Sequence, residues 1–319
     1  MRCGATIAPA RRPPTSSPML WRRDLLVGAD RSGLRHSRRV MDTRARNHVN
    51  VTGQGATTLL LAHGYGCDQT MWRRMVPLLE KDYRLALFDY VGYGQSESAA
   101  YDPEKYSALE GYAQDLIDVA RSVADGGPLV IVGHSVSAMI GLLADKKIPG
   151  LFSAHVMIGP SPAYINEPGY VGGFERSDID ELLETLEGNY LGWASSMAPA
   201  IMGAPDQPEL AQELTNSFCR TAPDIAVRFA RATFLSNNLS DLGGLKAPTL
   251  ILQSTQDFIA PVSVGEHMCQ ALPQATLQLI DNLGHCPHLS APEACVRSIH
   301  SFLVREGLAM KPIANEHSC

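Results

Sequence analysis

From residue 47 onward the sequence alternates short apolar runs with longer segments of helical periodicity. Most of these runs are hydrophobic on both faces, which is typical of a parallel sheet covered by helices on each side. The repeated order of strand, helix and strand predicts an α/β fold with a doubly wound, mostly parallel sheet. The expected strands are residues 57–64, 83–90, 128–135, 154–161, 248–255 and 276–282. The expected helices lie around residues 70–80, 107–125, 136–147, 262–272 and 291–305.

The alternation is interrupted once, between the fourth and fifth expected strands. Residues 164–240 show no strand pattern and hold several helical segments instead. In such sheets, ligands bind beyond the carboxyl ends of the strands, where the loops gather. We therefore expect a helical lid over a site at that edge, inserted into a core formed by residues 47–163 and 241–307.

The first 46 residues differ from the rest in composition. They are rich in Arg, Pro and Ser, have no sustained period and lack the apolar core of a secretory signal. We expect this segment to be disordered or extraneous. An organellar transit peptide is one interpretation of residues 1–40. We favour the other, a natural start at Met41, because the interpretable pattern begins directly after it. Residues 308–319 are expected to form a flexible tail.

Charge and cysteine content argue against several classes of protein. The formal net charge is −6, and because the first 47 residues hold eleven arginines against three aspartates, the remainder carries −14. An acidic body disfavours nucleic acid as a partner. The seven scattered cysteines include no C-x-x-C pair, so they indicate reduced thiols in a cytoplasmic protein rather than disulfides or a zinc site. No apolar run approaches the roughly 18 residues that span a bilayer. We expect no metal, no cofactor and no membrane association.

Residues 131–139, "IVGHSVSAM", combine the end of a strand with a serine at a sharp turn. A strand ending in Gly133, with Ser135 two positions later and a small residue two after that, is the layout of a nucleophile elbow. Ser137 stands where the usual G-x-S-x-G pattern has its second glycine. Ser135 is therefore the candidate nucleophile, provided that the chain also supplies a base, an acid and an oxyanion hole.

A serine hydroxyl needs a base to remove its proton. His285 follows a glycine in the loop after the last expected strand, whereas His288, three positions later, is more typical of a surface or a helix start. Asp257 lies in the loop after the preceding strand, and its rival Asp89 is better suited to brace a glycine-rich turn. Serine, aspartate and histidine then occur in the chain order that this fold uses for its triad.

The oxyanion hole requires two main-chain N–H groups. Val136, directly after the candidate nucleophile, should supply one. The glycine-flanked turn "HGYG" at residues 63–66 should supply the other, from Tyr65.

Eight segments of the chain can be compared with known sequence motifs: "GHSVSAMIG", "HGYGCDQTMW", "FDYVGYGQS", "YVGGFE", "NYLGW", "PDIAVRFARATFLS", "IAPVSVGEHM" and "GHCPHLSAPE". Together they resemble one group of α/β hydrolases, which contains the bacterial stress regulator RsbQ and the plant receptors for strigolactones and karrikins. The resemblance runs from residue 47 to about residue 305 and includes the serine at position 137.

This resemblance implies a triad of Ser135, Asp257 and His285 beneath a four-helix lid over a hydrophobic pocket. Tyr65 replaces the phenylalanine of the relatives' H-G-F-G motif, so its hydroxyl could alter ligand preference. By motif match, the pocket wall would comprise Tyr164, Phe174, Leu182, Trp193, Met197, Phe234 and Phe258. Packing within helices is the alternative role for these residues, and for Leu182 and Met197 the two roles stay equally open.

Two hypotheses follow. The first is a serine hydrolase that acts on small apolar esters or lactones through an acyl-enzyme, with a signalling or stress-regulatory role. The second is a ligand-binding regulator that mainly binds a protein partner, such as a regulatory phosphatase, and hydrolyses slowly. Dehalogenases and epoxide hydrolases need an aspartate at the elbow, where this chain has Ser135. Peroxidase-like chemistry without a cofactor remains an open alternative on the same three residues.

Overall fold

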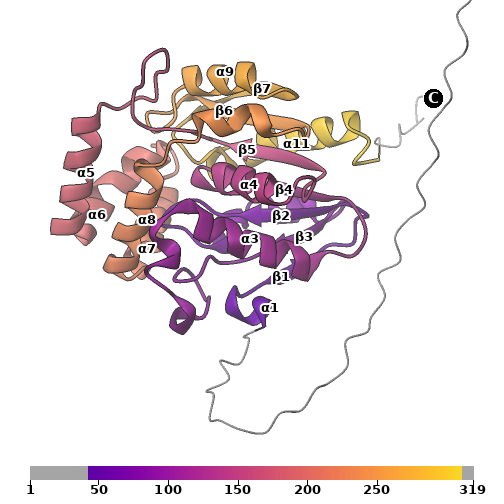
Figure 1. Ribbon diagram of the computed structural model, residues 1–319, viewed down its shortest axis with the longest axis horizontal. Coiled ribbons are helices and arrows are strands. Elements are labelled where there is room, and N and C mark those ends of the chain that lie inside the picture. Colours follow the sequence, from indigo (N-terminus) through magenta and orange to yellow (C-terminus); the bar gives the residue numbers. More distant parts are fainter. Residues whose placement is uncertain (1–41, 311–319) are drawn as a thin grey trace, which may run out of the picture. The chain divides into compact units, whose positions relative to one another are not determined.

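The computed structural model describes residues 42–310, and its centre is one seven-stranded sheet (Figure 1). The strand order is β1-β3-β2-β4-β5-β6-β7, with every neighbouring pair parallel except β1 and β3. The strands are β1 (Asn50–Thr52), β2 (Thr58–Ala62), β3 (Arg84–Leu87), β4 (Leu129–His134), β5 (Ala154–Ile158), β6 (Thr249–Gln256) and β7 (Ala275–Leu283). The six strands expected from the apolar runs are confirmed, as is the mostly parallel α/β class.

Helices cover both faces of this sheet, as side chains along β2 illustrate. Leu60 belongs to one hydrophobic cluster, whereas its neighbours Leu59 and Leu61 belong to another on the opposite face. The first cluster includes α3 (Leu109–Val123), α4 (Val136–Lys147) and α9 (Val262–Ala271). The second includes α2 (Val76–Leu79) and α11 (Pro292–Arg305). Burial on both faces explains why the central strands are apolar without alternation.

Two local elements differ from the expectation. The helix expected around residues 70–80 is divided into a 3-10 turn, η1 (Gln69–Trp72), and the short α2, which has Pro77 in its first turn. Proline fits the first turn of a helix but not its interior. The antiparallel edge strand β1 was not expected from the sequence. It is three residues long and exposed or half-buried, so it lacks the apolar run that marks the central strands.

Four helices lie between β5 and β6, within the expected lid region of residues 164–240. They are α5 (Arg176–Gly188), α6 (Tyr190–Met202), α7 (Pro208–Arg220) and α8 (Pro223–Phe234), here called the helical insertion. Each presents an apolar stripe, as α7 does with Leu210, Leu214 and Phe218 at intervals of four residues. α5 packs on α8 and α6 on α7. The insertion stands at the left of the sheet in Figure 1.

The remaining elements are short. They are α1 (Thr43–Arg46), α10 (Pro287–Ser290), η2 (Ser98–Ala100), η3 (Lys105–Ser107) and η4 (Leu239–Gly244). α1 begins four residues before the core boundary expected at residue 47. The expectations for residues 1–41 and 311–319 lie outside the described residues. Between residues 42 and 310, no helix combines the length and the hydrophobicity needed to cross a bilayer.

Candidate active site

Ser135 occupies the turn between β4 and α4 with a backbone that non-glycine residues rarely adopt. Its φ is 56° and its ψ is −125°. The Ser135 main-chain N–H donates to the carbonyl of Ile158 on β5 at 2.8 Å, which ties the turn to the sheet. A Cβ at Gly133 would lie 2.7 Å from the carbonyl oxygen of Ser137, so only glycine fits there. Strained backbone of this kind is characteristic of functional sites.

Ser137 has a structural role that its small size alone did not reveal. Its hydroxyl donates to the carbonyl of His63 at 2.5 Å and lies 3.0 Å from the Tyr90 hydroxyl. The serine therefore links α4 to the "HGYG" turn that begins at His63.

The three residues selected from the sequence as nucleophile, base and acid meet in one chain of hydrogen bonds. Ser135 Oγ lies 2.8 Å from His285 Nε2, and His285 Nδ1 lies 2.7 Å from Asp257 Oδ2. The other carboxylate oxygen, Asp257 Oδ1, accepts the main-chain N–H groups of Ile259 at 2.9 Å and Ala260 at 3.2 Å. All three side chains are buried. The carboxylate is therefore fixed on both oxygens.

This arrangement can activate the serine. A carboxylate can only accept hydrogen bonds, so it holds the proton of His285 on Nδ1. Nε2 then has a free lone pair that faces the Ser135 hydroxyl and can accept its proton.

Both rival residues lie elsewhere. Asp89 accepts the main-chain N–H groups of Gln69 and Gln95, each at 2.8 Å, and thus braces two turns. His288 lies at a helix start, in the first turn of α10, which is one of the two positions expected for it; it is not at the surface but fully buried, with its ring 4.9 Å from that of Trp72. Burial lowers the pKa of His288 well below its ordinary value, so its ring is neutral.

His134, at the end of β4, supports the main chain of the candidate base. Its Nε2 lies 3.0 Å from the carbonyl oxygen of His285, so this nitrogen carries the ring proton and donates it. Burial lowers the pKa of His134 to about 3, which keeps the ring neutral.

The two main-chain N–H groups expected to form an oxyanion hole have no other partner. Among residues 42–310, neither Tyr65 N–H nor Val136 N–H donates a hydrogen bond. Val136 is the first residue of α4, where helix geometry leaves the amide free and adds a positive dipole. A Cβ on Gly64 would lie 2.6 Å from the His134 ring, so glycine permits the close approach of this turn to the elbow.

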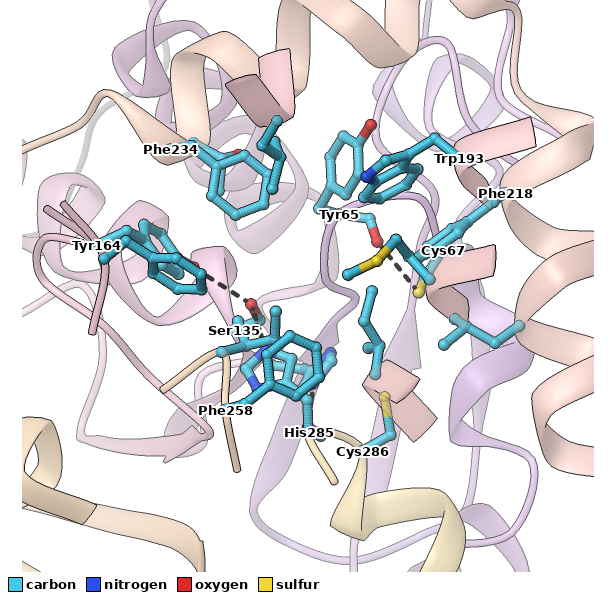
Figure 2. Close-up of a pocket in the computed structure, with 18 residues that line it drawn as sticks. Tyr65, Cys67, Ser135, Tyr164, Trp193, Phe218, Phe234, Phe258, His285 and Cys286 are labelled. Atoms are coloured by element: carbon cyan, nitrogen blue, oxygen red, sulfur yellow. Dashed lines mark hydrogen bonds between the residues drawn. The ribbon is translucent and has the colours of Figure 1, made fainter. Parts of the chain in front are cut away.

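A cavity of about 60 Å³ opens beside Ser135 and His285, beneath the helical insertion (Figure 2). All seven pocket residues implied by the resemblance line it: Tyr164, Phe174, Leu182, Trp193, Met197, Phe234 and Phe258. Sequence reasoning did not select several others, namely Cys67, Ile201, Leu214, Phe218, Thr233 and Ile259. The spacing of four residues between apolar side chains on α7 could have identified Leu214 and Phe218 from the sequence, because such spacing marks the buried face of a helix.

A tyrosine hydroxyl and two thiols of the wall are neutral. The Tyr164 hydroxyl lies 3.5 Å from Ser135 Oγ, and burial raises the Tyr164 pKa to about 12. Burial also raises the pKa of the Cys67 and Cys286 thiols, so both are protonated. Within the described part of the chain, no three His, Cys, Asp or Glu side chains gather in a way that could bind a metal ion.

Comparisons with known proteins show the family of the chain. A model of the alpha/beta hydrolase family matches residues 59–298. Karrikin insensitive 2 receptor CA of Petunia hybrida is 38% identical over 259 residues, which cover 80% of this chain and 96% of that protein. A strigolactone esterase of Pisum sativum is 36% identical over 247 residues, which cover 77% and 92%.

Solved structures of hydrolases also match this chain. A hydrolase from Oleispira antarctica superposes with a TM-score of 0.80 at 44% identity, covering 82% of this chain and 96% of that one. An esterase from Exiguobacterium antarcticum, at 20% identity and a TM-score of 0.74, shares the fold. The chain therefore belongs to the alpha/beta hydrolase family, and its relatives include a strigolactone esterase and a karrikin insensitive 2 receptor.

Proposed function

We propose that this protein is a serine carboxylic-ester hydrolase that acts on small apolar esters or lactones through an acyl-enzyme. The observation that carries the proposal is the chain of hydrogen bonds from Ser135 through His285 to Asp257 at the mouth of an apolar pocket. Esterases among the relatives support the same reaction class.

In the acylation step, His285 Nε2 takes the proton of Ser135 Oγ as this oxygen attacks the substrate carbonyl carbon. The N–H groups of Tyr65 and Val136 stabilise the negative charge that develops on the carbonyl oxygen. When the ester C–O bond breaks, His285 returns the proton to the departing oxygen. For a lactone this oxygen stays attached to the acyl chain.

In the deacylation step, His285 removes a proton from a water molecule, and the water oxygen attacks the acyl carbon. The bond between Ser135 Oγ and the acyl carbon then breaks, and His285 returns the proton to Ser135 Oγ as the acid is released. Asp257 keeps the His285 ring oriented and stabilises its protonated form in both steps. The aromatic pocket restricts water around the acyl group, which favours a long-lived acyl-enzyme.

Intact-mass analysis after exposure to activated esters and butenolide-type lactones tests this proposal. The wild-type protein should gain the mass of one acyl group, and peptide mapping should place it on Ser135. The Ser135→Ala variant should gain none. Acylation of Cys67 or Cys286, the two thiols in the same pocket, would contradict the assignment of the nucleophile.

The second candidate function is a ligand-binding regulator whose main task is to bind a protein partner, such as a regulatory phosphatase. One contact favours it: the main-chain N–H of His285 donates to the carbonyl of Ile201 on α6 at 2.8 Å. A structural change at His285 can therefore be transmitted directly to α6 of the helical insertion. Receptors among the relatives support the same role. A pull-down that compares apo and acylated protein, with turnover measured in parallel, separates the two functions.

A further inference from the structure

The Ser135 hydroxyl has two side-chain partners among the described residues, His285 and Tyr164. His285 Nε2 lies 2.8 Å from Ser135 Oγ, and the Tyr164 hydroxyl oxygen lies 3.5 Å from it, a contact drawn as a dashed line in Figure 2. The first contact carries the proton that Ser135 loses. The second takes no part in that transfer, so it needs an explanation of its own.

Tyr164 is the hydrogen-bond donor in this second contact. A serine hydroxyl carries one proton and can accept through its lone pairs. Because Asp257 holds the His285 ring proton on Nδ1, the Ser135 proton is directed to Nε2. Only the lone pairs of Ser135 Oγ then remain for Tyr164. Burial raises the Tyr164 pKa to about 12, so its hydroxyl keeps the proton that it donates.

The Tyr164 side chain is held in place from several sides. It is 1% exposed, and its ring packs edge-to-face against Phe234 of α8 with 5.0 Å between the ring centroids. The Tyr164 carbonyl accepts the main-chain N–H of Phe174 at 3.2 Å. A Cβ on Gly172 would lie 2.6 Å from the same carbonyl oxygen, so glycine permits this close packing. A donor fixed in this way needs no reorganisation when charge develops beside it.

Tyr164 and the expected oxyanion hole come from different parts of the fold. Tyr164 lies in the loop after β5, whereas Tyr65 belongs to the "HGYG" turn after β2 and Val136 begins α4. In Figure 2 the Tyr164 ring and Tyr65 lie on different sides of Ser135. The Tyr164 hydroxyl contacts the oxygen of the nucleophile itself, so its role differs from that of N–H groups that stabilise the substrate oxygen.

A separation of 3.5 Å is long for a hydrogen bond between two hydroxyl groups. Catalytic hydrogen bonds are often long in the free enzyme and shorten in the transition state. Bonds from a hydroxyl to a negatively charged oxygen are also shorter and stronger than neutral ones. Ser135 Oγ gains negative charge as it loses its proton, and again as its bond to the acyl carbon breaks. The contact is therefore strongest in the two transition states, where it accelerates the reaction.

We infer that Tyr164 is a further catalytic residue, whose hydroxyl donates a hydrogen bond to Ser135 Oγ and stabilises the charge on this oxygen in acylation and deacylation. This inference rests on the proposed function and extends its mechanism. Tyr164 keeps its own proton throughout. In acylation the Ser135 proton passes to His285 Nε2, and in deacylation the same nitrogen returns a proton to Oγ.

Pre-steady-state kinetics on a chromogenic ester test the inference, because they separate the rate constant of acylation from that of deacylation. Tyr164→Phe removes only the hydroxyl oxygen. We expect it to lower both rate constants about tenfold, as for the loss of one hydrogen bond to a charged group. The dissociation constant of the same ester, measured on Ser135→Ala protein with and without Tyr164→Phe, should be unchanged.

Tyr83→Phe is the matched control. Tyr83 is also 1% exposed, and its hydroxyl oxygen lies 2.8 Å from His300 Nδ1 on α11. It directly precedes β3, so it lies at the opposite end of the parallel strands from Ser135, which follows β4. Both rate constants should keep their wild-type values in this variant. Melting temperatures establish that each variant folds.

The inference is overturned if folded Tyr164→Phe protein keeps either wild-type rate constant, or if the substitution changes only the dissociation constant of the ester. The first result would show that the hydroxyl does not assist Ser135 Oγ. The second would make Tyr164 a binding residue of the pocket wall.

Failure of the proposed function is distinguishable, because then no ester acylates Ser135 in the wild-type protein. In that case the rate at which phenylmethanesulfonyl fluoride labels Ser135, followed by intact mass, decides the inference. Ser135 Oγ bonds to sulfur, fluoride leaves, and the serine proton passes to His285, so the same oxygen develops charge. Tyr164→Phe should lower this rate constant about tenfold. An unchanged rate constant, or no labelling of the wild-type protein, overturns the inference.

Discussion

Ser135 Oγ lies 2.8 Å from His285 Nε2, although 150 positions separate the two residues in the chain. Ser135 follows β4 and His285 follows β7, and strands β5 and β6 lie between them in the sheet. The loop that carries His285 reaches back across this edge. Gly284 makes this possible: its φ is 99°, and a Cβ there would lie 2.1 Å from the carbonyl oxygen of Met202. The helical insertion thus holds the base in place.

Replacement of the nucleophile or the base should remove esterase activity and leave the fold intact. Ser135→Ala and His285→Ala should each lower kcat on the order of 10⁴-fold or more, because members of such a triad act as a unit. Steady-state kinetics on an activated ester measure the loss, and thermal melting controls for folding. If folded Ser135→Ala protein retained more than a tenth of the wild-type kcat, the proposed mechanism would be wrong.

Asp257→Asn should be far more damaging than Asp89→Asn. An amide at position 257 can still accept the N–H groups of Ile259 and Ala260, but its NH₂ group then faces His285 Nδ1 and favours the wrong tautomer. We expect a fall in kcat of about 10⁴-fold. Asp89→Asn should mainly affect stability, because Asp89 braces turns. The reverse ranking of the two kcat values would show that the acid is wrongly assigned.

Removal of residues 1–40 should leave the melting temperature and the turnover unchanged, because their composition offers no apolar face to bury. Removal of residues 1–46 is the matched comparison. It also deletes α1 and Arg46, whose guanidinium lies 3.1 Å from the buried carboxylate of Asp115. We expect this deletion to lower the unfolding free energy by roughly 1–2 kcal/mol. A clear fall in melting temperature for the shorter deletion would mean that residues 1–40 stabilise the body.

Stability should decrease as the pH falls below about 6.5. Burial lowers the pKa of His155 to about 3, so between these values the unfolded chain binds a proton that the folded chain does not. His155→Leu should therefore reduce the difference in unfolding free energy between pH 7 and pH 5 by ~2 kcal/mol. Urea denaturation of both proteins at pH 7 and pH 5 measures this difference in unfolding free energy. An unchanged difference would show that His155 does not contribute.

Covalent modification of Ser135 should change hydrogen exchange in the helical insertion, α6 above all. The physical reason is the bond from the His285 N–H to the Ile201 carbonyl, since a ligand shifts a conformational equilibrium only through unequal interaction with its two states. Exchange on apo and inhibitor-modified protein measures this effect. Identical protection in both forms, together with turnover in the tens per second on a simple ester, would argue for a metabolic esterase and against a regulator.

Much of the fold could be predicted from the sequence, because each of its main features has a local signal. Double-sided burial produces the uninterrupted apolar runs of the central strands, and the elbow needs small residues around Ser135. Edge strand β1 has no such signal, since its three residues are largely exposed. The same holds for the buried position of His288, because nothing near it in the chain shows that Trp72 packs against its ring.

The α/β class, the helical insertion and the candidates Ser135, Asp257 and His285 could all be inferred from the sequence. The distances of 2.8 and 2.7 Å between these three side chains depend on strand order and loop paths, which no local sequence pattern specifies. The same is true of the pocket wall, whose members come from the loop after β5, the helical insertion, the loop after β6 and the "HGYG" turn. The hydroxyl of Ser137 is the clearest case, because it donates to the carbonyl of His63, 74 positions earlier in the chain. A sequence shows that a hydroxyl exists, but hydrogen bonding depends on every atom that packs around it, and most of those atoms come from distant parts of the chain.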